Sequence, residues 1–232
     1  MKRPPSGCYI VTMKMRVAVR RFSLAVMLSA ILWAPAQASA RGDLKAGYDA
    51  MLRHDYEKAV ALLTSAIESG DLSHANLALA YHYRGAEYLK IDRPDDAITD
   101  LERAIAMEQR RYPTAYSDRG IAYRMKGDYP KAIADYSEAI RLWPDWHDWY
   151  LNRGIAYAAN GQHREAIADY DRALYYRPGL ASAYVARADV FLQQGRNGEA
   201  LADYRTALRE DPDLFARYPG VAAKMAALGA GL

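Results

Sequence analysis

Apolar and small residues recur along the chain with the spacing of amphipathic helices. Residues 114–126 and 130–143 each place them three and four positions apart, on one face of a helix. The segment between the two stretches contains Gly127, which suits a left-handed turn, and Pro130, which suits a helix start. No stretch of the sequence shows the alternation of a strand. This pattern predicts an all-α chain built from antiparallel helix pairs.

The helix-pair pattern itself repeats along the chain with a nearly constant period. Residues 113–146 and 147–180 are identical at 14 of their 34 positions, and the same positions recur further along the chain in both directions. Two helices this short cannot bury their apolar faces alone, so neighbouring pairs must stack into a solenoid. The repeat divides the chain into five units, over about 41–77, 78–112, 113–146, 147–180 and 181–214.

These units resemble the tetratricopeptide repeat. That family has aromatic residues at positions 4, 11 and 24 of its unit, small residues at positions 8, 20 and 27, and proline at position 32. The third unit supplies them as Tyr116, Tyr123, Tyr136, Gly120, Ala132, Ala139 and Pro144. The first unit matches least well, with Asp43 at the first aromatic position. The resemblance implies a right-handed α-solenoid of five helix-turn-helix units.

The end of the chain, residues 215–232, resembles the capping helix and tail that such arrays need. Val221, Met225 and Leu228 would form the apolar stripe of one helix over residues 215–228.

Position 7 of the unit carries arginine where the family usually has leucine. In four units an aspartate stands at position 23, which sets the two side chains opposite each other on the paired helices. The first unit lacks both residues. Removing one partner of a buried ion pair is costly, whereas replacing both is not. We therefore predict four structural ion pairs: Arg84 with Asp100, Arg119 with Asp135, Arg153 with Asp169, and Arg187 with Asp203.

Residues 1–40 predict a secretory signal peptide. A segment rich in basic residues, 14–21, precedes the uncharged run Phe22–Trp33. An Ala-x-Ala site then ends at Ala40. This run is shorter than the roughly 20 residues that span a bilayer as a helix. Cleavage after Ala40 would remove Cys8, the only cysteine. We expect a secreted, periplasmic protein; the alternative is an uncleaved signal that tethers an assembly factor to the membrane.

The distribution of charge argues against a nucleic-acid partner. Residues 1–40 hold six basic and no acidic side chains, so 25 of the 31 lysines and arginines remain in residues 41–232, against 28 aspartates and glutamates. A nucleic-acid-binding protein would keep its basic excess in the folded part.

The sequence contains no recognisable catalytic or cofactor motif. Its five histidines stand at unrelated repeat positions, and it has neither a phosphate-binding glycine loop nor a hydrolase elbow. Asp145, His147 and Asp148 could contact a metal, but polar residues are expected at the inter-repeat turn where they lie. We predict a non-enzyme without cofactor or metal.

The resemblance implies that positions 5, 9 and 12 of each first helix line a concave groove for a partner protein. Most residues there are apolar, which favours an extended or amphipathic segment with apolar anchors. The lysines and asparagines with which chaperone-binding members hold a C-terminal carboxylate are missing. The candidate contact residues are Leu44, Tyr48, Met51, His82, Leu89, Ser117, Arg124, Leu151, Val185, Asp189 and Leu192.

Three tryptophans, Trp143, Trp146 and Trp149, cluster where the third and fourth units meet. They can join the two units, or Trp146, next to the turn, can serve as a binding hot spot. The sequence thus favours a scaffold or adaptor that binds another protein. A binder of cell-wall glycan or of a small ligand through tyrosine and tryptophan faces stays open as an alternative.

Overall fold

The structure is a computed structural model that describes residues 39–108 and 112–229. Within these ranges every regular element is a helix. The predicted signal peptide lies outside them except for residues 39 and 40, which stand in the first described helix. Its cleavage therefore stays a prediction.

Ten of the described helices form five antiparallel pairs. The first pair consists of a helix over residues 39–52 and α2 (Tyr56–Glu68). The other pairs are α3 (His74–Lys90) with α4 (Pro94–Met107), α5 (Pro113–Met125) with α6 (Tyr129–Leu142), α7 (His147–Ala159) with α8 (His163–Tyr176), and α9 (Ala181–Gln193) with α10 (Asn197–Glu210). The extra residues between the first two units lengthen α3 at its start, where the Ser73 side chain accepts a hydrogen bond from the Asn76 N–H.

The turn inside each pair uses one left-handed residue. Gly127, Gly161 and Gly195 have φ values of 71 to 78° in the last three pairs, and His54 and Asp92 take this place in the first two. The next N–H then bonds back to a carbonyl five residues earlier, as from Asp128 to Tyr123 at 2.9 Å. This closure satisfies the end of the first helix and reverses the chain.

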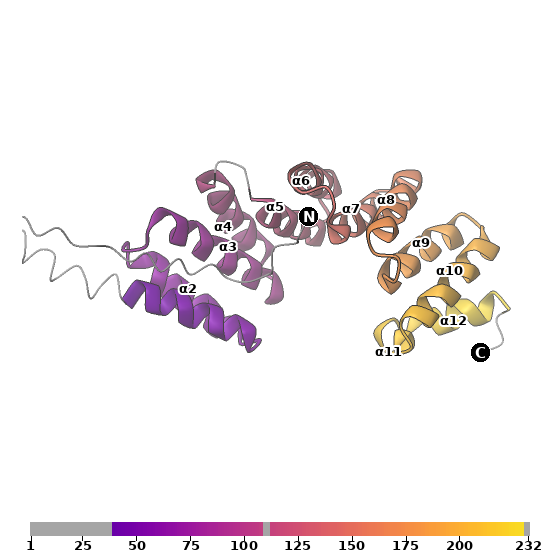
Figure 1. Cartoon of the computed structure of the whole chain (residues 1–232), viewed down its shortest axis with the longest axis horizontal. Helices are drawn as coiled ribbons and strands as arrows, with labels where there is room; N and C mark the ends of the chain where they lie inside the picture. The colour runs from indigo at the N-terminus through magenta and orange to yellow at the C-terminus, as the bar shows by residue number, and fades with distance from the viewer. Residues whose placement is uncertain (1–38, 109–111, 230–232) are drawn as a thin grey trace, which may run out of the picture.

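The pairs follow one another along an arc (Figure 1). The second helices α4 and α6 lie on its outer side, and the first helices α3 and α5 lie on its inner side. Successive first helices also contact one another, α3 with α5, α5 with α7, and α7 with α9. We call the surface formed by the first helices the concave face.

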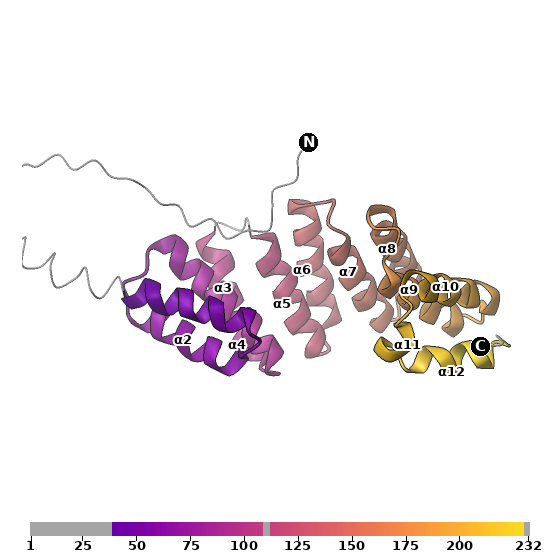
Figure 2. The same cartoon turned by 60° about the horizontal axis from the view of Figure 1, so that its bottom comes forward.

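The C-terminal end corrects the expectation of one capping helix over residues 215–228. The chain instead forms α11 (Leu214–Arg217) and α12 (Gly220–Ala227), beside α10 (Figures 1 and 2). Pro219 explains the break, because it lacks an N–H and drives the residue before it out of helical geometry. Tyr218 accordingly has φ −132° and ψ 71°. Val221 and Met225 are still buried against the fifth pair.

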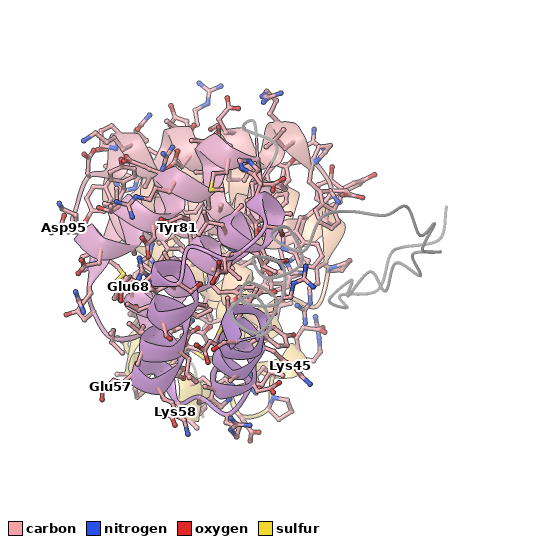
Figure 3. All side chains as sticks on the ribbon, turned by 90° about the vertical axis from the view of Figure 1, so that its left-hand side faces the viewer. Lys45, Glu57, Lys58, Glu68, Tyr81 and Asp95 are labelled. Carbon is pink, nitrogen blue, oxygen red and sulfur yellow. The ribbon has the colours of Figure 1, made fainter. Side chains whose placement is uncertain are left out.

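The other end of the array is polar. Lys45, Glu57, Lys58 and Glu68 are exposed on the helix over residues 39–52 and on α2 (Figure 3). A terminal unit has no neighbour on its outer side, so it needs such a surface.

Candidate partner-binding surface

Four Arg–Asp pairs join the two helices of the second to fifth units. Each is bidentate, with Nε 2.6 to 2.8 Å from one carboxylate oxygen and Nη2 2.7 to 3.0 Å from the other. The four aspartates are buried. The pairs are those predicted from positions 7 and 23 of the unit: Arg84 with Asp100, Arg119 with Asp135, Arg153 with Asp169, and Arg187 with Asp203.

Each arginine also reaches the second helix of the preceding unit, which the sequence analysis missed. Arg84 donates to the Thr64 hydroxyl at 2.9 Å and Arg153 to the Ser137 hydroxyl at 3.0 Å. Arg187 pairs with Asp171, and Arg119 lies 4.0 Å from Glu102. The four acceptors all occupy position 25, a polar position that recurs in the sequence. The arginines therefore join neighbouring units as well as paired helices.

Aromatic rings flank the same arginines. In each of the four units the guanidinium lies 5.5 to 5.9 Å from the ring centres at positions 4 and 11. This spacing allows cation–π attraction. The tyrosines at positions 4 and 11 of these units therefore have a structural role beside the ion pairs.

The protonation behaviour of these pairs reflects their burial. Burial opposes the charge of Arg119, but its hydrogen bonds to Asp135 raise its pKa above the ordinary value. Burial also raises the pKa of Asp135, although Arg119 lowers it. The same directions hold for Arg153 and Asp169. The desolvation of each pair is thus costly, and the attraction between its charges offsets that cost.

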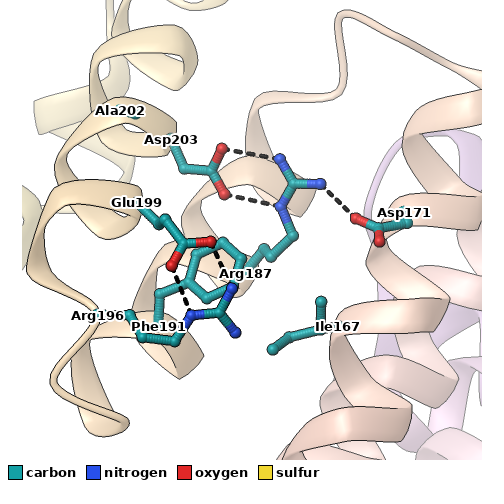
Figure 4. Close-up of a pocket in the computed structure, with 8 residues that line it drawn as sticks. All are labelled: Ile167, Asp171, Arg187, Phe191, Arg196, Glu199, Ala202 and Asp203. Atoms are coloured by element: carbon teal, nitrogen blue, oxygen red, sulfur yellow. Dashed lines mark hydrogen bonds and ion pairs between the residues drawn. The ribbon is translucent and has the colours of Figure 1, made fainter.

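A shallow depression of about 370 Å³ lies beside the last of these pairs (Figure 4). Its charged residues pair with one another: Arg187 with Asp203 and Asp171, and Arg196 with Glu199. These ion pairs stabilise the packing of the helices around the depression.

The predicted groove residues divide into two groups. Leu44, Ser117, Leu151 and Val185, all at position 5, are buried. Position 5 packs there between adjacent helices, so these four side chains support the concave face and offer a partner no surface. The other seven are partly exposed: Tyr48, Met51, His82, Leu89, Arg124, Asp189 and Leu192.

An aromatic row on the concave face runs from the first unit to Tyr112, the residue before α5. The Tyr48 and Tyr83 ring centres are 5.4 Å apart, Tyr83 and His82 are 5.8 Å apart, and His82 and Tyr112 are 4.7 Å apart. His82 Nε2 lies 2.9 Å from Asp118 Oδ2, and His82 Nδ1 lies 2.9 Å from the Tyr112 hydroxyl. His82 therefore links α3 to α5.

Sequence reasoning missed Tyr83, Tyr112 and Asp118. Tyr83 and Asp118 share position 6, which follows the inward-facing position 5 on the helix. The signal was available, because position 6 lies three residues before position 9 and therefore next to it on the helix surface.

Asp189 is the centre of a polar cluster at the C-terminal end of the concave face. It accepts hydrogen bonds from the Tyr204 hydroxyl and, at 2.6 Å, from Lys224 Nζ of α12. Burial, the hydrogen bond from the Tyr204 hydroxyl to Asp189 and the negative charge of Asp189 all raise the pKa of Tyr204.

A second tyrosine with the same repeat position lies in the third unit. Tyr136 is fully buried and its ring edge meets Gly120 of α5, 2.8 Å from where a Cβ would stand. Burial raises the pKa of Tyr136 to about 12, against the effect of the Arg124 charge. The Tyr136 hydroxyl and Arg124 Nε are both shielded from solvent, and neither has a hydrogen-bond partner among the described residues.

The three tryptophans of the cluster differ in their exposure to solvent. Trp149 is 3% exposed, whereas Trp143 and Trp146 are 38% and 42% exposed. The centres of their rings lie 5.4 to 6.3 Å apart, and His147 stacks on Trp146. His147 Nδ1 lies 3.0 Å from Asp148 Oδ1. Trp149 therefore joins the units, and Trp143 and Trp146 form an exposed aromatic surface.

The described residues contain no group of three or more histidine, cysteine or acidic side chains that could hold a metal ion. None of the helices in the described part of the chain is long and apolar enough to cross a bilayer.

The family model described as "Tetratricopeptide repeat" matches residues 84–145 and 151–215, more than half of the chain. The chain belongs to the tetratricopeptide repeat family. Tetratricopeptide repeat proteins mediate protein–protein interaction, and their fold is generally a non-catalytic one.

Named relatives match parts of this tetratricopeptide repeat protein. The chloroplastic tetratricopeptide repeat domain-containing protein PYG7 of Arabidopsis thaliana is 31% identical over 108 residues, 47% of this chain and 36% of its own. Hsc70-interacting protein 1 of Drosophila melanogaster is 36% identical over 87 residues, 38% of this chain and 22% of its own. The matched regions thus cover about a third or less of these relatives' lengths.

Among solved structures, the chain is similar to TTC0263, a thermophilic tetratricopeptide repeat protein of Thermus thermophilus. The TM-score is 0.63 at 25% identity, over 79% of this chain and 99% of that one.

Proposed function

We propose that this protein is a non-catalytic scaffold or adaptor of the bacterial envelope that binds a segment of another protein on its concave face. The observation that carries the proposal is a line of partly exposed apolar and aromatic side chains along the first helices. They include Tyr48, Met51, Leu89 and Leu192. Such a line suits an extended or amphipathic segment with apolar anchors. One relative is named for its interaction with Hsc70, in line with a role in protein binding.

The envelope location rests on the sequence of residues 1–40. A basic region, an apolar run and an Ala-x-Ala site favour export. Release of the protein from the envelope without detergent is the expected outcome. Retention in the membrane would favour the alternative of a tethered assembly factor.

The test of segment binding is crosslinked capture from envelope extract, followed by mass spectrometry. Tyr48→Ser combined with Leu89→Ser changes the concave face at partly exposed positions. The matched control is Tyr175→Ser, because Tyr175 is 72% exposed on α8, a second helix. We expect a partner that the control captures and the concave variant loses. Equal capture by both variants would move the binding site away from the concave face.

A second candidate function follows from the exposed rings of Trp143 and Trp146. Tryptophan faces can stack on the apolar faces of sugar rings, so a cell-wall glycan is a candidate ligand. Its test is binding to purified sacculi by the protein and by Trp146→Ala. Equal binding by both would remove this surface from consideration.

A further inference from the structure

The fifth unit shows how a carboxylate satisfies a buried tyrosine behind the concave face. Tyr204 comes from the second helix α10, and its hydroxyl reaches Asp189 on the first helix α9. Lys224 donates to the same carboxylate oxygen at 2.6 Å. One phenol and one cation thus share one acid there.

The third unit has a phenol and a cation but lacks the acid. Tyr136 stands at the repeat position of Tyr204, and Arg124 is a charged neighbour of its hydroxyl. At the position of Asp189, however, the third unit has Ile121. The Tyr136 hydroxyl and Arg124 Nε accordingly have no acceptor among the described residues. A shielded donor without an acceptor costs free energy, so an added acceptor there is favourable.

The charged neighbours do not supply that acceptor. Asp118 lies within electrostatic reach of the Tyr136 hydroxyl, but its Oδ2 is hydrogen-bonded to His82 at 2.9 Å. Arg124 itself is partly exposed, and no ion pair involves it among the described residues. A positive group at the middle of the concave face is therefore available to a ligand.

We propose that Arg124 and Tyr136 bind the side-chain carboxylate of an aspartate or glutamate in the partner segment. This inference rests on the proposed function, since it needs a segment on the concave face. The approaching acid meets the exposed part of Arg124, and a rotation of that flexible side chain uncovers the phenol. The site belongs to the third of five units, so a segment can continue on both sides; this favours a side chain over a chain terminus.

The experiment selects displayed random peptides on the purified protein and measures their affinity by fluorescence anisotropy. Each selected peptide is compared with a counterpart whose acid is replaced by the amide. We expect the acid to bind on the order of ten- to a hundredfold more tightly, the range of charge-assisted hydrogen bonds.

Three variants make the test specific. Arg124→Gln removes the cation, and Ile121→Asp supplies an internal carboxylate like that of Asp189. Both should reduce the preference for acid to within about twofold, on the scale of a lost charged bond. Arg141→Gln is the matched control, because Arg141 lies exposed on the second helix α6 and should leave the preference unchanged. Thermal unfolding verifies that each variant is folded.

The outcomes separate this inference from the proposed function. Peptides that bind without a preference for acid, or whose preference survives Arg124→Gln in the folded protein, would overturn the carboxylate site and leave segment binding intact. If the intact protein selects no peptide, segment binding and the carboxylate site both fall.

Discussion

Tyrosines at the same position of different units have different partners for their hydroxyl groups. Position 24 holds tyrosine in the last three units, and its ring is buried each time: Tyr136, Tyr170 and Tyr204. The hydroxyl of Tyr204 bonds to Asp189, whereas that of Tyr136 has no partner among the described residues. Identical side chains at identical positions therefore contribute differently to stability.

Tyrosine-to-phenylalanine substitutions should show this difference. Tyr204→Phe loses a hydrogen bond to a carboxylate and should lower the free energy of unfolding by about 1.5 kcal/mol. Tyr136→Phe removes an unpaired donor and should leave it unchanged or raise it by up to about 1 kcal/mol. Denaturant unfolding of both variants is the measurement. Equal losses would show that Tyr136 has a partner in solution.

Glu87 is a second residue with an unusual surrounding. It stands at position 10, where the following units have Ala122, Ala156 and Val190, and its Oε2 is buried without a hydrogen-bond partner among the described residues. Burial raises the pKa of Glu87 above its ordinary 4.5, against the charges of Lys90 and His54. The folded state thus binds this proton more tightly than the unfolded state.

This shift has a definite sign in a pH profile. Stability is lost as the pH rises from about 4.5 through the raised pKa, because the folded state holds the proton longer. Glu87→Gln removes that loss. It should be roughly 1 kcal/mol more stable than the wild type at pH 7 and should lose this advantage near pH 4. Urea unfolding at both pH values measures it, and a destabilised variant at pH 7 would contradict it.

At the scale of helices, the bidentate ion pairs join paired helices and neighbouring units together. Arg153 contacts Asp169 of α8 and Ser137 of α6. Replacing only the arginine or only the aspartate leaves a buried charge without its partner, whereas replacing both residues does not.

Arg153→Ala should therefore destabilise the protein by about 3 kcal/mol. Adding Asp169→Leu should recover part of this loss, because it removes the unpaired carboxylate. Chemical denaturation of the single and double variants makes the comparison. A double variant no more stable than the single one would refute the buried-charge explanation.

In the first four units, close approach of the paired helices depends on glycine at position 8, whereas the fifth unit has Ala188 there. A Cβ on Gly154 would lie 2.6 Å from Tyr170 Cε1 and 3.2 Å from the Ala166 carbonyl oxygen. Such overlap pushes the two helices apart.

Gly154→Ala should therefore lower the free energy of unfolding by about 2 kcal/mol. The matched control is Gly198 in α10, where a Cβ meets nothing within 4 Å. Gly198→Ala should raise stability by about 0.5 kcal/mol, since alanine favours the helix. The two melting temperatures should move in opposite directions; a shift of the same sign in both would argue against the close approach.

At the scale of the whole molecule, the stability of each unit depends on its contacts with the neighbouring units. In such arrays each pair is stabilised by its neighbours, and the terminal units need caps. Here α12 buries Val221 and Met225 against the fifth pair and also supplies Lys224 to the concave face. The cap therefore contributes both to the core and to the candidate binding surface.

Met225→Ala should loosen this end selectively. Met225 is 2% exposed, and its truncation should cost about 2 kcal/mol or more. Hydrogen exchange should accelerate in α9 and α10 while α3 and α4 stay unchanged, because each unit contacts mainly its neighbours. Acceleration through all five pairs would show that the array unfolds as one unit.

The sequence by itself determined the helices, the repeat and the family. Side chains at recurring positions face the same neighbours in every unit, so periodicity alone identifies the core and the Arg–Asp spacing. The solenoid and the tetratricopeptide repeat family were confirmed. A C-terminal capping helix was confirmed as α12, but the predicted span of residues 215–228 was wrong, because the helix breaks at Pro219.

Only the tertiary structure decided which groove residues a partner can reach. The repeat position predicts Leu44, Leu151 and Val185 as contact residues. They are buried because neighbouring helices pack closely against them. The unpaired donors Arg124 and Tyr136 likewise depend on two helices meeting. Exposure and hydrogen bonding are properties of side chains brought together across units, so no pattern along one helix contains them.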